Sequence, residues 1–113
     1  MLRSIKTNQR LQRELCIRLD GTGTGTAALT IGSGLGTLVD NGTGDYTITF
    51  ARAFSRTPIG HVTPITAAKN ARLVLTTTTC QVLGFNQADG TTASDLDADI
   101  TIKGWDTVDE YDE

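Results

Sequence analysis

The chain has 113 residues, which is the size of one domain, and 38% of them are hydrophobic and only 5% aromatic. With 12 glycines as well, this composition predicts a small core, shared among short strands or completed by neighbouring copies of the chain. The sequence contains no run of about 18 apolar residues that could span a membrane, and its N-terminus lacks the apolar stretch of a secretory signal. We therefore expect a chain that is made and folded in a cytoplasm, without a membrane partner.

The formal net charge of −3 hides an uneven distribution. Residues 1–20 carry five basic and two acidic side chains, a net charge of +3, whereas residues 86–113 carry nine acids and only Lys103, a net charge of −8. Charge separated in this way can steer one end of a molecule toward a partner of opposite sign, including the other end of a neighbouring copy. An ordinary solvated arm and tail explains the distribution equally well.

The N-terminal segment allows two local structures. Leu11 and Leu15 are spaced i, i+4, with Thr7 or Asn8 as a cap, which allows one short helix. Residues 14–20 alternate instead, and this predicts a strand with three side chains on one face: Leu15, Ile17 and Leu19.

Glycine runs at residues 21–25 and 32–36 predict turns or mobile loops. Between them, residues 26–31 predict a strand whose apolar face contains three side chains: Ala27, Leu29 and Ile31. Residues 37–40 then lead into Asn41-Gly42, which predicts a tight hairpin turn with positive φ at both residues. The turn reading is preferred over a glycosylation acceptor at Asn41, because no secretory signal is present.

The rest of the chain also predicts strands. After the hairpin, residues 45–50 alternate, with Tyr46, Ile48 and Phe50 on one face. Pro58 and Pro64 make residues 57–66 an edge or irregular strand, because proline removes a ladder donor. Residues 72–85 form one long strand or two with a break. The last expected strand covers residues 97–105 and places three side chains inward: Ala98, Ile100 and Ile102.

Short strands with closely spaced turn signals and little support for helix predict an all-β fold, an antiparallel β-sandwich or a jelly-roll-like barrel with a basic N-terminal arm. We divide the chain into an arm or first strand at residues 1–20, a β-sandwich domain at residues 21–106 and an acidic tail at residues 107–113.

The residues that carry chemistry do not assemble into a catalytic pattern. His61 is the single histidine and no GxSxG motif accompanies it, so we expect no catalytic residue and no enzyme. The GTGTG run lacks the GxGxxG spacing, so no nucleotide or other cofactor is expected. Cys16 and Cys80 are interpreted as two buried free thiols, with a disulfide as the alternative.

Three aspartates at residues 95, 97 and 99 resemble part of a calcium loop, but the sixth and twelfth positions hold Ile100 and Asp106 instead of glycine and glutamate. Alternation along a strand explains the aspartates, so no metal site is expected, and a weak cation site between copies is the alternative.

Two sets of residues are candidates for binding. The basic arm has no aromatic residue to stack on bases and the rest of the chain is acidic, so no nucleic-acid partner is expected. The arm combines positive charge with apolar side chains, and its candidate partner-binding residues are Arg3, Lys6, Arg10, Leu11 and Arg13. Trp105 and Tyr111 are the candidate ligand-binding residues for a carbohydrate.

Two longer stretches carry a family resemblance. The segment "LVDNGTGDYTITFARAF" followed by "SRTPI" resembles a strand-turn-strand element of tailed-bacteriophage virion proteins, notably small head or tail fibre and decoration proteins. The segment "TCQVLGFNQADGTTASDLDADITIKGWDT" is similar to their closing hairpin. The resemblance covers residues 37–106, about two-thirds of the chain.

The resemblance implies a non-enzymatic virion structural protein, made in the host bacterial cytoplasm and located in the virion. It implies a homotrimer or larger oligomer whose partners are its own copies and other virion proteins of the capsid or tail. The chain is short and has no heptad repeat for a coiled-coil stalk, so a capsid decoration protein or a small head or tail fibre component is favoured. The alternative is an adhesin domain that recognises host-surface carbohydrate.

Overall fold

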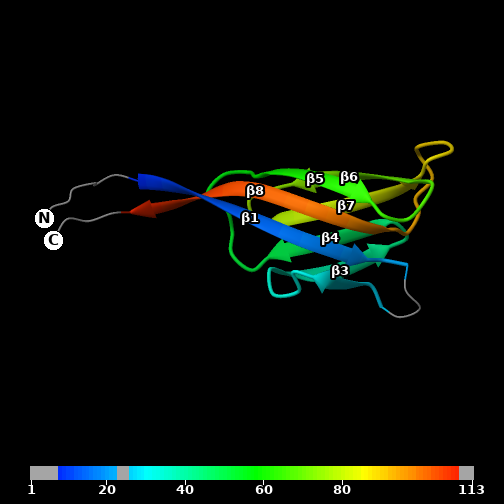
Figure 1. Ribbon diagram of the computed structural model, residues 1–113, viewed down its shortest axis with the longest axis horizontal. Coiled ribbons are helices and arrows are strands. Elements are labelled where there is room, and N and C mark those ends of the chain that lie inside the picture. The colour runs from blue at the N-terminus through cyan, green and yellow to red at the C-terminus, as the bar shows by residue number, and fades with distance from the viewer. Residues whose placement is uncertain (1–7, 23–25, 110–113) are drawn as a thin grey trace, which may run out of the picture.

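The computed structural model describes residues 8–22 and 26–109. Within these residues the chain forms eight β-strands and no helix (Figure 1). The strands are β1 (Asn8–Asp20), β2 (Ala28–Ile31), β3 (Gly36–Gly42), β4 (Asp45–Phe50), β5 (Ile59–Pro64), β6 (Lys69–Leu75), β7 (Thr79–Asn86) and β8 (Asp97–Asp109). None of the described residues forms a helix long and apolar enough to cross a bilayer.

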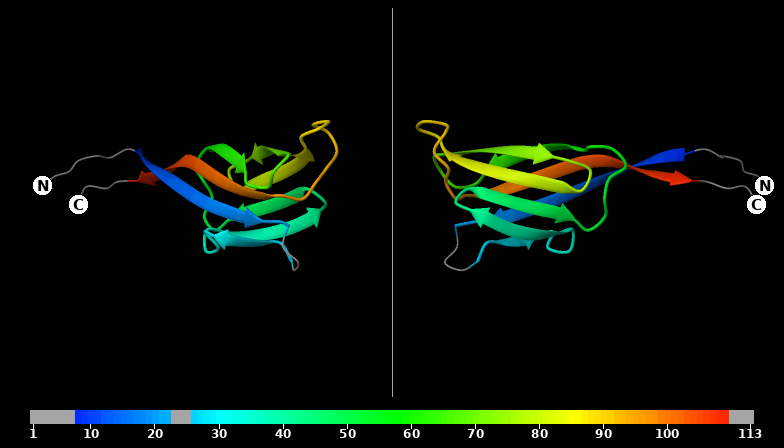
Figure 2. Two further views of the ribbon diagram at one scale, coloured as in Figure 1. Left: turned by 45° about the vertical axis from the view of Figure 1, so that its right-hand side comes forward. Right: turned by 180° about the vertical axis from the view of Figure 1, so that it is seen from behind.

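The strands form two four-stranded sheets that face one another (Figure 2). The β1–β8 sheet has the order β2-β1-β8-β5, and the β4–β7 sheet has the order β3-β4-β7-β6. Every pairing between these strands is antiparallel. The all-β prediction is therefore confirmed, and because the sheets are separate and open, the architecture is an antiparallel β-sandwich.

The core lies between the two sheets and follows from the period of two along each strand. β1 and β8 supply alternating apolar side chains from one side, and β4 and β7 supply them from the other. The buried residues are Leu15, Ile17, Leu19, Tyr46, Ile48, Phe50, Phe54, Cys80, Val82, Leu96, Ala98, Ile100 and Ile102. The inward faces expected for residues 14–20, 45–50 and 97–105 are confirmed.

At one side of the sandwich the edge strands β5 and β6 approach one another closely. Gly60 on β5 leaves room for β6, since a Cβ at this position would lie 2.9 Å from Leu73 Cδ1 and 3.0 Å from Leu75 Cδ1. The absence of a side chain at Gly60 therefore lets the two sheets close along this side.

The short helix allowed around Leu11 and Leu15 is wrong, because β1 runs as one extended strand from Asn8 to Asp20. It pairs with β8 along all 13 of its residues, from Asn8 opposite Asp109 to Asp20 opposite Asp97. A continuous ladder pairs the backbone groups that β1 and β8 direct toward each other, which outweighs a single i, i+4 pair of leucines. The strand also takes up most of residues 1–20, and residues 1–7 lie outside the described residues.

Two predictions in the first half need correction. Ile31 was expected on the inner face but is exposed, because the β1–β2 register shifts between Arg18 and Leu19; Ala27 and Leu29 do pack against the core. The hairpin turn lies at residues 43–44 instead of Asn41-Gly42.

The hairpin differs because the side chains of Asp40 and Asn41 bond locally. Asp40 Oδ1 accepts the N–H of Gly42 at 3.0 Å, and Asn41 Nδ2 donates to Thr47 Oγ1 at 2.8 Å. The pairing of β3 with β4 shifts register here, between Asp40 and Gly42. Gly42 and Gly44 have φ of 130° and 66°, whereas Asn41 keeps a negative φ, so this residue extends β3 instead of forming the turn.

In the second half, residues 72–85 fall in two strands with a threonine turn between β6 and β7. The N–H of Thr76 donates to Thr79 O at 2.9 Å, and Thr76 Oγ1 accepts the N–H groups of Thr78 and Thr79. β5 is an edge strand that ends at Pro64, as expected from its prolines. β8 continues to Asp109, so residues 107–109 belong to the sheet and not to a separate tail.

Both cysteines are free thiols, as expected, but they differ in burial. Cys80 lies in the core, and burial raises the pKa of its thiol to about 12. Cys16 is exposed on the outer face of the β1–β8 sheet, so the expectation of two buried thiols is wrong for this residue. The alternation of β1 explains it, because Leu15 and Ile17 on either side point into the core.

Candidate interaction surfaces

β1 and β8 continue beyond the other strands as a two-stranded ribbon, which carries both described ends of the chain (Figure 1). β2 pairs with β1 only from Arg18 onward, and β5 pairs with β8 only up to Lys103. We call residues 8–12 of β1 and residues 105–109 of β8 the terminal ribbon. An isolated pair of strands is marginally stable in water, so the contacts at its base matter.

Arg13 fastens the base of the terminal ribbon to the sandwich. Its Nη2 donates to Arg52 O at 2.9 Å, to Ala53 O at 3.0 Å and to Asp106 Oδ1 at 3.0 Å. Its guanidinium carbon lies 4.0 Å from the centroid of the Phe54 ring. The side chain thus joins both strands of the ribbon to the β4–β5 connection through hydrogen bonds, charge and a cation–π contact.

Asp106 is shared between two arginines of different exposure. Arg13 and Asp106 are 17% and 15% exposed, whereas Arg52 is 70% exposed, and its Nη2 reaches Asp106 Oδ2 at 2.5 Å. The exposed Arg52–Asp106 pair contributes little to stability, because water screens the attraction between its charges. The Arg13–Asp106 pair is therefore the main electrostatic contact at the base of the ribbon.

The segment that follows β4 also contacts the base of the terminal ribbon. The N–H and Oγ of Ser55 donate to Trp105 O at 3.0 Å and 2.7 Å. Phe54 packs edge-on against Phe50, with ring centroids 5.1 Å apart. Gly104 makes this packing possible, because a Cβ there would lie 2.4 Å from Phe54 Cδ1.

The opposite end of the sandwich is organised by aspartates. Asp97 Oδ1 accepts the N–H groups of Gly21 and Thr22 and the hydroxyl of Thr22, all within 3.1 Å. Burial acts to raise the pKa of Asp97, but these hydrogen bonds outweigh it, and the pKa is lowered from its ordinary value. Its carboxylate therefore fixes the chain as it leaves β1.

Asp95 has a similar structural role. Its Oδ1 accepts the N–H of Gly44 at 2.8 Å and the hydroxyl of Tyr46 at 2.9 Å. Burial, with Asp95 as the second cause, raises the pKa of the Tyr46 phenol. The contact ties the β3–β4 hairpin to the segment that precedes β8.

Asp99 pairs with Arg18 across the β1–β8 sheet through two hydrogen bonds of 2.6 Å and 2.9 Å. The hydrogen bond from Arg18 lowers the pKa of the Asp99 carboxyl. The three aspartates thus have separate partners, and no cluster of three or more histidine, cysteine or acidic side chains that could hold a metal ion occurs in residues 8–22 and 26–109.

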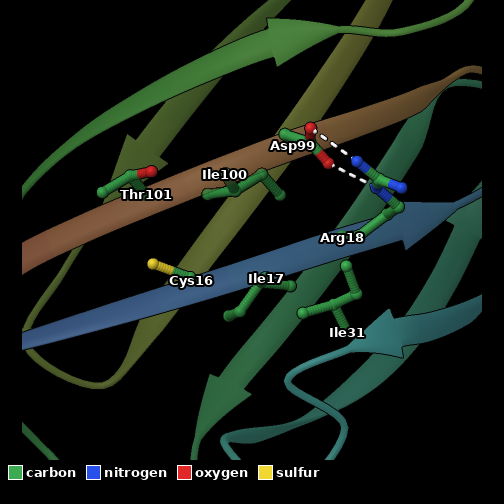
Figure 3. Close-up of a pocket in the computed structure, with 7 residues that line it drawn as sticks. All are labelled: Cys16, Ile17, Arg18, Ile31, Asp99, Ile100 and Thr101. Atoms are coloured by element: carbon green, nitrogen blue, oxygen red, sulfur yellow. Dashed lines mark hydrogen bonds and ion pairs between the residues drawn. The ribbon is translucent and has the colours of Figure 1, made fainter.

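A hollow of about 230 Å³ lies beside this pair on the β1–β8 sheet (Figure 3). It is lined by Cys16, Ile17, Arg18, Ile31, Asp99, Ile100 and Thr101. In the close-up, Arg18 and Asp99 face one another while the Cys16 thiol lies apart from them. Arg18 and Asp99 already satisfy one another, so the hollow presents little unpaired polar chemistry to a ligand.

The large exposed apolar side chains do not form one surface. On the β1–β8 sheet, Ile31 lies on β2 opposite Arg18, and Ile59 lies on β5 opposite Lys103. They are on opposite edges of the sheet, with β1 and β8 between them. Val39 and Val74 lie on the two edge strands of the other sheet. Scattered apolar residues of this kind do not identify a binding face.

The structure separates the predicted partner-binding residues. Arg3 and Lys6 lie outside the described residues. Arg10 and Leu11 belong to β1 in the terminal ribbon, opposite Thr107 and Asp106. Arg13 is engaged within its own chain, so its guanidinium serves the fold.

The predicted ligand-binding pair cannot be assembled from the described residues. Trp105 lies on β8 at the base of the ribbon, opposite Gln12, and is half-buried, while Tyr111 lies outside the described residues. His61 is exposed on β5 opposite Thr101.

The cluster of Arg13, Arg52 and Asp106 was not predicted from the sequence. These residues are 39 to 93 positions apart, and only the pairing of β1 with β8 brings Arg13 and Asp106 together. The signal in the sequence was the opposite charge of the two ends, which indicated attraction without giving a register.

Comparison with known proteins gives no relative: no family model, no curated protein and no solved structure matches this chain.

Proposed function

We propose that this chain is a non-enzymatic structural protein of a bacteriophage particle, a capsid decoration protein or a small head or tail fibre component that assembles as a homotrimer. The observation that carries the proposal is the division of the molecule into a sandwich and a terminal ribbon that holds both described ends (Figure 1). A body displayed on a narrow ribbon suits a component that is attached at one end.

Three further observations support an architectural role. The aspartates considered for a cation site and the arginine considered for partner binding join strands and loops within the chain, as in the contacts of Arg13, Asp97 and Asp99. The resemblance of residues 37–106 to small virion proteins of tailed bacteriophages points to the same class. The two charged chain ends favour contact between oppositely charged neighbours.

Adding the protein back to particles tests the proposal. Particles from a deletion strain would be incubated with the purified, fluorescently labelled chain and separated by gradient sedimentation. We expect the chain to sediment with the particles in saturable amounts, and not with the same particles prepared from the parent strain, whose sites are filled. Equal binding to both preparations, or none to either, would contradict the proposal.

A further inference from the structure

Among the strands formed by residues 8–22 and 26–109, none pairs with the two outer edges of the terminal ribbon. Ser55 N and Ile65 N reach the carbonyl oxygens of Trp105 and Asp97 on the side of β8 that faces away from β1. Backbone groups of an antiparallel strand alternate between its two sides. The N–H and C=O groups of Thr107 and Asp109 therefore also point away from β1. The pairing of β5 with β8 ends at Lys103, so β5 does not reach these groups.

The other edge of the ribbon has the same property. Gln12 lies opposite Trp105, so the backbone groups of Gln12 point away from β8, and alternation gives the same direction to Arg10 and Asn8. β2 pairs with β1 only from Arg18 onward. Each copy thus presents two open strand edges, which are templates for pairing with another strand.

We propose that these edges join copies of this chain, with β1 of each copy pairing with β8 of the next around a closed ring. The inference deepens the proposed function and rests on it for the number of copies, three. β1 runs toward the sandwich and β8 runs away from it. When the sandwiches all point the same way, β1 of one copy and β8 of its neighbour are therefore antiparallel, as they are within the chain.

Charge selects this arrangement over pairing between like strands. In the ribbon, residues 8–12 of β1 carry Arg10 and no acid, whereas residues 105–109 of β8 carry Asp109 and no base. The other acid of this part of β8, Asp106, is already paired with Arg13 in its own chain. Pairing β8 with β8, or β1 with β1, brings like charges together, and a two-fold dimer of that kind is disfavoured. Pairing β1 with β8 brings opposite charges together at every interface, and such a heterologous contact forms a ring when the rotation between copies closes.

Proline substitutions test the proposal because proline lacks the N–H that such pairing needs. The N–H groups of Arg10 and Thr107 point to the free edges, so Arg10→Pro and Thr107→Pro leave the ladder within the chain intact, and proline is tolerated at such edge positions. Arg10→Ala and Thr107→Ala are matched controls that keep the N–H. Light scattering at micromolar concentration measures the mass, and circular dichroism measures the β-structure.

We expect the wild-type chain and both alanine variants to have three times the 12.0 kDa mass of one chain, and both proline variants to be monomers with the wild-type circular dichroism spectrum. Proline variants that remain trimers would overturn the inference while leaving the proposed homotrimer intact. A wild-type monomer would overturn both, and binding to deletion-strain particles would still test the virion role separately.

A charge exchange keeps the inference testable if a proline variant does not fold. Arg10→Glu and Asp109→Lys each place like charges across the interface and should raise the trimer dissociation constant several-fold in low salt. The double variant restores opposite charges and should return the constant to near the wild-type value. Single variants with unchanged dissociation, or a double variant weaker than both, would contradict pairing between β1 and β8.

Discussion

At the scale of single residues, polar side chains hold this sandwich together at its two ends. Arg13 and Asp106 fasten the terminal ribbon, while Asp95 and Asp97 fix the loops at the other end. Each contact joins residues far apart in the chain, and each lies beside a buried apolar cluster. Specific changes at these positions should therefore affect stability more than their partial exposure suggests.

Replacing Arg13 and Arg52 in turn should show which of their two ion pairs with Asp106 contributes more to the free energy of unfolding. Arg13→Met removes the contacts with Asp106, with two backbone carbonyls and with Phe54, so we expect a loss of about 1 to 3 kcal/mol in the free energy of unfolding. The matched variant Arg52→Met removes the more exposed partner of the same carboxylate and should change the free energy by about 0.5 kcal/mol or less. Urea unfolding followed by Trp105 fluorescence measures both, and equal losses would contradict this account of the ribbon base.

Asp97, at the start of β8, should make the free energy of unfolding depend on pH in the acid range. The lowered pKa of Asp97 means that its carboxylate stabilises the folded chain above the ordinary carboxyl pKa near 3.8, and that this stabilisation is lost as the pH falls through the lower, folded-state value. Asp97→Asn cannot titrate, so its free energy of unfolding should be lower than wild type at pH 7 and should fall less steeply in acid.

Urea titrations from neutral pH into acid measure this difference, since the stabilisation by a carboxylate with a lowered pKa is lost below the ordinary carboxyl pKa. Glu14→Gln is the control, because it removes an exposed carboxyl on the outer face of the same sheet. Parallel curves for wild type and Asp97→Asn would show that Asp97 does not contribute to the acid dependence.

At the scale of elements, the alternation of apolar residues predicted most strands, and long-range pairing decided the rest. Tyr46, Ile48 and Phe50 could be placed inward because their period of two is unbroken in the sequence. Ile31 could not, because its exposure depends on a register shift between β1 and β2. The length of β1 was equally hidden, since it is set by its pairing with β8, about 90 residues away along the chain.

The position of the β3–β4 turn could not be predicted from the Asn-Gly motif, because local side-chain hydrogen bonds compete with the turn. Asn41-Gly42 has the composition of a two-residue turn, but the hydrogen bonds of Asp40 and Asn41 stabilise an extended end of β3. The ribbon cluster of Arg13 and Asp106 also escaped prediction, because charge patterns do not specify which strands are neighbours.

Two glycines with similar backbone angles test the packing of this hairpin. Gly44 has φ of 66°, and a Cβ there would lie 2.7 Å from Gly84 O and 2.7 Å from Ser94 N; Gly90 has φ of 71° and open space around it. Both alanine variants carry the cost of a left-handed conformation, about 1 to 2 kcal/mol. Gly44→Ala should cost about 1 to 3 kcal/mol more, because the surrounding backbone must shift.

Thermal and urea unfolding of the two variants measure this difference. Losses of the same size at Gly44 and Gly90 would mean that the segment before β8 yields freely, and that the tie between the hairpin and this segment is weaker than the geometry indicates.

At the scale of the whole molecule, the sandwich and the terminal ribbon assign different tasks to different parts of the chain. The sandwich buries its own core, whereas the ribbon has open edges and opposite charges on its two strands. The proposed ring uses these edges to join copies, and it brings the ends of all copies to one place.

Removing the first seven residues tests their part in attachment without shortening β1. Residues 1–7 contain Arg3 and Lys6, and the deletion leaves every residue of β1 in place. We expect the truncated chain to fold and form trimers but to bind deletion-strain particles weakly. Arg3→Gln with Lys6→Gln should give a milder loss that high salt makes smaller relative to wild type. Undiminished binding by the truncated chain would move attachment to the sandwich or the acidic C-terminus.

Quantitative mass spectrometry of purified particles tests the virion assignment most directly. Particles would be prepared from the strain that carries the coding sequence, and labelled peptides from the described strands would count copies per particle against the major capsid protein. The account predicts that the chain copurifies with particles at a fixed copy number divisible by three. Abundant protein in the lysate with none in the purified particles would contradict it.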